Sequence, residues 1–162
     1  MTGLAGASIY NAFGDKRNLF RLALELYVKL HYTERTKRLE ATLSPQAAIV
    51  AFINEVVRES VEDDARKGCL LVNSAMEIAP HDPEFLQIVT AALDHVETFF
   101  RRNVETGHAD GSIGNSQTSS DMASMLLGMM IGIRVLARTV SDRSTLEGLV
   151  RPAYALLAPD SA

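Results

Sequence analysis

The chain has 162 residues, of which 47% are hydrophobic and 22% charged, so a packed domain is expected and disorder is excluded. The net charge of −4 argues against nucleic-acid binding over the whole surface, but the charge is uneven. Residues 1–43 contain seven Lys and Arg against four Asp and Glu, whereas residues 44–162 contain nine against sixteen. A basic end on an acidic body is typical of a protein that touches a polyanion at one end, and ordinary surface variation is the alternative.

The sequence predicts neither secretion nor a membrane span. No basic segment followed by an apolar one opens the chain. The most apolar run, residues 122–137, is interrupted by Ser124 and Arg134 and is too short to cross a bilayer. The single cysteine excludes an internal disulfide. We therefore expect a soluble cytoplasmic protein without a membrane partner.

Residues 3–20 predict a short helix, a tight turn and the start of a long helix. Ile9 and Phe13 lie four apart and share one face of the short helix. Gly14 stands where a helix ends in the left-handed conformation, and Asp15 is a good N-cap for the next helix. The rest of the chain is organised around this stretch.

Residues 8–16, Ser-Ile-Tyr-Asn-Ala-Phe-Gly-Asp-Lys, resemble the recognition helix, turn and fourth-helix start of the TetR family of transcriptional regulators. Tyr10, Phe13 and Lys16 match the signature residues of that family in order and spacing. The remainder is similar, more weakly, to the helical regulatory domain of the family. The resemblance implies an all-α fold, with a partial helix-turn-helix in residues 1–20 and a ligand-binding and dimerisation domain in residues 21–162.

In that family two helices precede this point, whereas here Met1 stands almost directly before the expected recognition helix. We therefore expect a truncated chain, a start placed too late, or a chain that has lost its DNA-binding half. By resemblance, Tyr10 would reach the DNA backbone, and Lys16 at a helix start would meet a phosphate. The groove-facing residues would be Gly6, Ala7, Ser8 and Asn11. The alternative is that Tyr10 packs on the long helix, as we expect of Phe13.

Helical periodicity continues along the chain. A long helix from Lys16 to about Glu40 has an apolar stripe at Leu19, Ala23, Leu26 and Leu30, widened by Phe20, Leu24 and Tyr27. Its end, residues 34–40, reads as a solvated charged face. Ser44 and Pro45 open a second helix to about residue 62, and a charged connection leads to a third over residues 69–79. That third helix is apolar on most sides and is expected to be buried.

Three further segments complete an all-α chain. Asp82 and Pro83 open a helix to about residue 106, and residues 107–117 form a loop. Residues 118–121 resemble a capping box that opens a nearly all-apolar helix, and residues 144–147 form a full capping box for the last helix, which ends near residue 157. No strand, repeat or second domain is expected.

The resemblance also implies a small-molecule pocket among the central helices. Large adaptable apolar side chains suit such a pocket, namely Phe52, Met76, Phe99, Met125 and Met129. For each of them core packing is the alternative. Asn73, Glu77 and His95 would orient a ligand or be exposed.

The all-apolar helix needs burial on two sides, which favours a homodimer. Gly128 and Gly132 lie four apart and let another backbone approach closely. By resemblance the last two helices pair with their copies, which adds Leu146 and Leu149 to the interface. Close packing within one chain is the alternative.

Catalysis is not expected. Glu105 and His108 have the spacing of a di-iron helix motif, but the other copy and the extra glutamates that such a site needs are absent from the sequence. Cys69 follows Arg66 and Lys67, a setting that lowers a thiol pKa, although a buried inert cysteine is the favoured interpretation. We expect no cofactor and no metal.

The sequence thus predicts a homodimeric, ligand-responsive, DNA-binding transcriptional repressor. A small apolar or amphipathic effector is expected to release it from operator DNA. The DNA partner depends on the missing N-terminal helices being present in the native protein. The alternative is a helical small-molecule-binding or dimerisation module without DNA-binding activity.

Overall fold

The computed structural model describes residues 14–140 and 142–159, and these residues are all-α, as the sequence predicts. The first elements of the described residues form a long rod made of α2 (Lys16–Val28), the π-helical segment η1 (Lys29–Thr33) and α3 (Glu34–Thr42). The chain continues through α4 (Pro45–Val61), α5 (Leu70–Glu77), the 3₁₀ turn η2 (Ala79–His81), α6 (Pro83–Asp110), α7 (Ser119–Leu136) and α8 (Arg143–Leu156).

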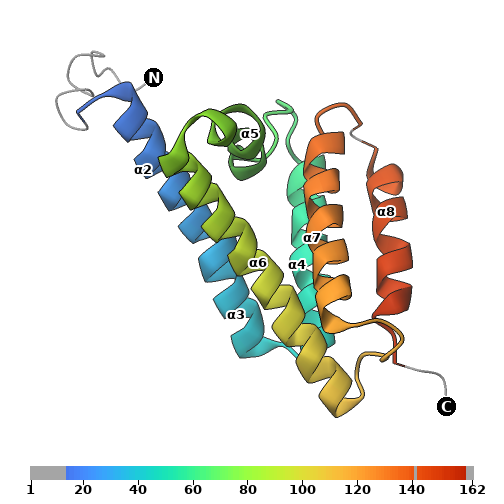
Figure 1. Ribbon diagram of the computed structural model, residues 1–162. Coiled ribbons are helices and arrows are strands. Elements are labelled where there is room, and N and C mark those ends of the chain that lie inside the picture. The colour runs from blue at the N-terminus through green and yellow to red at the C-terminus, as the bar shows by residue number, and fades with distance from the viewer. Residues whose placement is uncertain (1–13, 141, 160–162) are drawn as a thin grey trace.

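The helices form a bundle with the rod on one side (Figure 1). The rod packs on α4, α5 and α6, while α6 runs along α7, and α8 packs on α4 and α7 at the opposite side. The first turn of α2 and the last turn of α8 lie at opposite ends of the molecule.

The centre of the bundle is aromatic. The ring of Phe52, on α4, lies 5.4 Å from that of Phe99 and 5.2 Å from that of Phe100, both on α6. All three side chains are buried, and Leu126 and Met130 of α7 join the same core. Close contact between offset or tilted rings adds to the stabilisation that burial of their area provides.

Several helix starts agree with the sequence. The carboxylate of Asp15 accepts a hydrogen bond from the Asn18 amide at 2.7 Å, and Thr118 caps α7 through the Asp121 amide at 3.1 Å. The last helix differs, because its N-cap is Asp142 rather than Ser144: the Asp142 carboxylate accepts from the Thr145 amide at 2.9 Å. Asp142, two residues before Ser144, caps the free amides of the first turn in its place.

Helix α6 is longer than predicted, since it runs through Gly107 to Asp110. A Cβ at position 107 would lie 2.5 Å from Ile113, so glycine is needed there for Ile113 to fold back over the helix. Gly111, with φ of 78°, ends the helix in the left-handed conformation. The loop is therefore shorter and better packed than its composition indicates.

The rod buries the part of the predicted stripe formed by Phe20, Leu24 and Tyr27, and leaves another part of it exposed. Leu24 is fully buried, whereas Leu26 and Leu30 are each 56% exposed. Helix α2 has apolar residues on more than one face, and the single chain covers only the face that turns toward α5 and α6. The predicted solvated face at residues 34–40 is also wrong in part, because Arg35 and Thr36 are buried against the bundle.

Helices α5 and α7 are each exposed in part. Helix α5 is largely covered, as expected, since Leu71, Val72 and Ser74 are buried. Only its last two residues face solvent, because Met76 is 49% exposed and Glu77 is exposed as well. Helix α7 has 18 residues, and by length and composition it is the one helix among the described residues that could cross a membrane. It is longer than the predicted apolar run, and its buried side packs on α4 and α6 as a core helix does.

Candidate effector pocket

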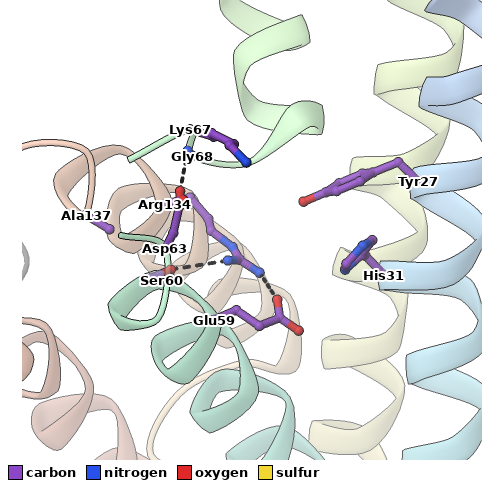
Figure 2. A pocket seen from close by; sticks show the side chains of 9 residues that line it. All are labelled: Tyr27, His31, Glu59, Ser60, Asp63, Lys67, Gly68, Arg134 and Ala137. Carbon is purple, nitrogen blue, oxygen red and sulfur yellow. Dashed lines mark hydrogen bonds and ion pairs between the residues drawn. The ribbon is translucent and has the colours of Figure 1, made fainter. Parts of the chain in front are cut away.

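A pocket opens where the rod, the C-terminal end of α4 and the end of α7 meet (Figure 2). Its volume is about 190 Å³. The rod contributes two ring side chains, α4 and the following loop contribute polar groups, and α7 contributes an arginine and an alanine. The lining residues are Tyr27, His31, Glu59, Ser60, Asp63, Lys67, Gly68, Arg134 and Ala137.

The π-helical segment η1 shapes the rod at this pocket. The amide of Glu34 donates to the carbonyl of Lys29, five residues earlier, so one turn holds an extra residue. Tyr32 is thereby fully buried, while His31 lies at the pocket. Such π turns are rare inside helices and are frequent at functional sites.

The two aromatic rings of the rod form one wall. The His31 ring stacks on Tyr27 with centroids 4.2 Å apart and an interplanar angle of 27°. The Tyr27 hydroxyl donates to Cys69 Sγ at 3.5 Å, and the Tyr32 hydroxyl lies 2.9 Å from the same sulfur. Burial lowers the pKa of His31, so this imidazole is neutral at neutral pH. Burial is also the main cause that raises the pKa of Tyr27, which keeps its hydroxyl protonated.

The opposite wall is an ion network. Arg134 Nη2 donates to Glu59 Oε2 at 2.5 Å, and Arg134 Nη1 donates to Ser60 Oγ at 3.2 Å. The other Glu59 oxygen pairs with Arg35, which also pairs with Glu55 at 3.1 Å. Burial raises the pKa of Glu59, but the Arg134 hydrogen bond and the charges of Arg35 and Arg134 outweigh it and hold the pKa below its ordinary value. Glu59 is therefore ionised and shared between two cations.

The loop between α4 and α5 is held in one shape. Gly68, with φ of 72°, donates its amide to Asp63 Oδ2 at 2.8 Å, and Asn73 Nδ2 donates to the Lys67 carbonyl at 2.9 Å. A Cβ at position 68 would lie 3.0 Å from the Arg138 side chain. These contacts set the position from which Lys67 reaches the pocket.

The residues 45–152 match the family model described as "Tetracyclin repressor-like, C-terminal domain", which covers more than half of the chain. The chain belongs to the TetR family. It is 28% identical over 156 residues to the uncharacterized HTH-type transcriptional regulator YezE of Bacillus subtilis, covering 96% of this chain and 80% of the relative.

Solved structures of TetR regulators have the same fold. A cysteine mutant of the TetR family regulator CifR, complexed with 26 bp operator DNA, superimposes with a TM-score of 0.78 at 26% identity over 94% of this chain and 80% of that one. A TetR family regulator from Agrobacterium tumefaciens has a TM-score of 0.84 at 23% identity, covering 96% of this chain and 82% of its own. The TetR-like fold expected from the sequence is thus confirmed.

The ligand-binding residues predicted from the sequence do not come together around this pocket. Phe52 and Phe99 touch in the aromatic core, and Met76 is exposed on α5. Met125 lies near Leu156 beside a separate surface hollow. Met129 is half-buried on α7. Their assignment as effector contacts stays a prediction that the geometry does not favour.

The predicted polar ligand contacts have other partners or face solvent. His95 Nε2 lies 2.8 Å from Thr36 Oγ1, which joins α6 to the rod. Asn73 holds the Lys67 carbonyl, next to the pocket, and accepts from Arg138 at 3.4 Å. Glu77 is exposed on α5.

The sequence does not identify the residues of this pocket. Its periodicity indicates Tyr27 as part of the core stripe of the rod and Arg134 only as an interruption of an apolar run. A charged residue inside such a run is costly to bury without a partner, which makes it a signal for a buried site. Its partner Glu59 comes from another helix, 75 residues away, and no local pattern pairs them.

The predicted dimer residues lie on α7 and α8 and differ in exposure. Gly128 is exposed, and a Cβ added at Gly128 or Gly132 would meet nothing within 4 Å in the single chain. Leu149 is 38% exposed, whereas Leu146 is fully buried in the core of its own chain. Val135, Leu136 and Leu156, each close to 40% exposed, are large apolar residues of the same two helices.

Of the predicted DNA contacts, only Lys16 belongs to the described part of the chain. It is the first residue of α2 and is exposed. Gly6, Ala7, Ser8, Tyr10 and Asn11 lie outside the described residues.

Cys69 is buried, with 1% of its surface exposed, as the favoured interpretation expects. It precedes α5 and contacts the hydroxyls of Tyr27 and Tyr32. Within the described residues no group of three or more His, Cys, Asp and Glu side chains is placed to hold a metal ion. Glu105 contacts Ser119 at 3.4 Å, and His108 Nε2 has no partner among those residues. The relatives are regulators rather than enzymes.

Proposed function

We propose that this chain is a cytoplasmic, ligand-responsive DNA-binding repressor that releases operator DNA when a small effector fills the pocket of Tyr27, His31 and Arg134. One observation carries this proposal: the pocket is walled by the rod that leads out of the N-terminal stretch resembling a recognition helix. A ligand there touches the element that would carry the DNA-reading head. The operator complex of CifR supports DNA binding in the family.

The N-terminal end of the rod, next to the expected DNA-reading part, is bound to α6 by ion pairs. A movement at the pocket would therefore be transmitted along the rod. Arg17 pairs with Asp82 at 3.0 Å and with Glu84 at 2.6 Å, and its guanidinium lies 5.3 Å above the Phe85 ring. Effector and operator would favour different positions of the rod, and a coupling of about 1–3 kcal/mol between the sites suffices for regulation.

The exposed apolar face of α7 and α8 provides the surface for a second copy. Two heads on one dimer read two half-sites, so their spacing decides whether operator binds. Residues 1–20 form the DNA-reading part in this proposal and residues 21–162 the regulatory body. Lys16 meets a phosphate, Tyr10 the DNA backbone, and Gly6, Ala7, Ser8 and Asn11 the groove.

DNA binding is tested by fluorescence anisotropy on DNA from upstream of the gene, across a salt series. The 162-residue chain is measured beside a version extended to the next upstream in-frame start codon. We expect binding that weakens steeply with salt, because phosphate contacts release counterions. Absence of binding by both chains would overturn the DNA proposal in favour of a binding module without DNA activity.

The dimer is tested with Gly128→Leu and Gly132→Leu. A Cβ at either position would meet nothing within 4 Å in the single chain, so the variants are expected to fold. Forced overpacking between copies is expected to weaken association by about 1–3 kcal/mol. Gln87→Leu, which adds the same side chain at an exposed position of α6, serves as the control. Light scattering that shows equal dimer strength in all three variants would remove this interface.

A further inference from the structure

We propose that the effector is a small organic acid whose carboxylate is held between Lys67 and Arg134. This inference rests on the proposed function, because it takes the pocket beside the rod as the effector site. It goes further by assigning the chemical class of the ligand.

Arg134 has an unused hydrogen-bond donor. Its side chain is only 7% exposed, and Nη1 and Nη2 are taken by Ser60 and Glu59. Its Nε is buried and has no acceptor among the described residues. Buried donors in folded proteins are almost always paired, so an unpaired one beside a cavity calls for an acceptor from outside the chain.

Lys67 supplies a second donor from the other side of the pocket. It is exposed, and no carboxylate of the described part of the chain pairs with its ammonium. Figure 2 shows the Lys67 side chain, the Tyr27 hydroxyl and the Arg134 guanidinium directed toward the same space. Two cations that converge from the loop and from α7 match the oxygens of one carboxylate. The Tyr27 hydroxyl, which donates to Cys69 Sγ, borders the same space.

Glu59 is neutralised from within the chain, and Asp63 has a backbone partner. Both oxygens of Glu59 pair with arginines, and Asp63 Oδ2 accepts the Gly68 amide. A cationic ligand would therefore face Arg134 and Lys67 without a free carboxylate at Glu59. An anion meets the unused donors instead.

Size and wall chemistry define the rest of the ligand. The volume of about 190 Å³ is below the roughly 300–1,000 Å³ of sites for drug-sized molecules. The stacked Tyr27 and His31 rings and Ala137 offer a flat, largely apolar surface. A compact aromatic or short-chain carboxylic acid fits both properties.

The test is isothermal titration of the full chain with two acids and their neutral amides, benzoate against benzamide and hexanoate against hexanamide, at constant ionic strength. We expect at least one acid to bind at least about tenfold more tightly than its amide, because charge-assisted hydrogen bonds are stronger than neutral ones. Equal affinity within both pairs, or no binding of either acid at millimolar concentration, would overturn the proposal.

Variants locate the binding. Lys67→Gln is expected to weaken acid binding roughly 10- to 100-fold and leave amide binding unchanged. Lys37→Gln, at an exposed position of α3 outside the pocket, is the matched control. Arg134→Lys keeps a cation beside Glu59 and removes the Nε donor, so it should weaken acid binding as well. Acid affinity that is unaltered in both pocket variants would exclude this site.

DNA release separates this inference from the proposed function. Acid that binds in titration but leaves the operator complex intact supports the ligand class and contradicts the regulatory proposal. Operator release by the neutral amides alone supports regulation through the pocket and overturns the assignment of an acid.

Discussion

Two regions along one face of α4 are built differently. Phe52 and Glu59 lie seven residues apart, which is nearly two full turns, so they share a face of the helix. Around Phe52 aromatic rings pack against one another, whereas around Glu59 ion pairs and a π turn border a cavity. Arg35 joins the two regions, because its guanidinium lies 5.6 Å above the Phe52 ring and also pairs with Glu59.

The comparison teaches where a pocket forms in a small bundle. Deformable apolar side chains pack against one another until no ligand-sized space remains between them. Guanidinium and carboxylate groups need fixed hydrogen-bond geometry, so their neighbours cannot close in equally well. The site thus lies where polar groups interrupt the core.

The largest effect is expected from Phe52→Ala, which should lower the free energy of unfolding by about 3–5 kcal/mol through lost burial and a cavity. Urea denaturation measures this change. Leu86→Ala, at a position that is 50% exposed, is the control and should stay within about 0.5 kcal/mol of wild type. A loss of less than about 1 kcal/mol at Phe52 would mean that the aromatic region is loosely packed.

A smaller loss, about 2 kcal/mol, is expected from Glu59→Gln, because two buried arginines lose their shared anion. A fully buried pair would cost roughly 3–5 kcal/mol, and the Glu59 side chain is 27% exposed. Glu147→Gln removes an exposed pair with Arg143 and should change stability by less than about 0.5 kcal/mol. Equal effects of the two variants in denaturation would show that the network at the pocket is no stronger than a surface pair.

The smallest effect concerns pH. Burial lowers the pKa of His31 from 6.5, so the unfolded chain binds this proton first as the pH falls. The contribution of His31 therefore reduces stability as the pH drops below about 6.5. His31→Gln should make the fall in melting temperature between pH 7 and 5 shallower than in wild type. An identical pH profile would place His31 in open solvent.

The sequence predicted the local structure well where a helix end has its own chemistry. Asp15, Asp82 and Thr118 cap the helices that they were expected to cap, since the capping side chain and the amides it binds are neighbours in the chain. Prediction was weaker where two local signals compete, as with Asp142 and Ser144 at the last helix.

Helical periodicity alone does not determine which face of the rod is buried. Helix α2 offers apolar residues on more than one side, and periodicity does not say which side meets α5 and α6. The π segment η1 also has no clear local signal, because tertiary packing of Tyr32 against Cys69 accompanies the extra residue.

By itself the sequence determined the all-α class, most helix starts and membership of the TetR family, because these depend on short-range spacing and on a contiguous motif. Only the tertiary structure decided where the pocket lies. The pocket takes side chains from three elements far apart in the chain, namely Tyr27, Glu59 and Arg134. A lone arginine in an apolar run does not indicate which residue pairs with it. Long-range pairing of buried charge is a property of the assembled bundle, and the effector site follows from it.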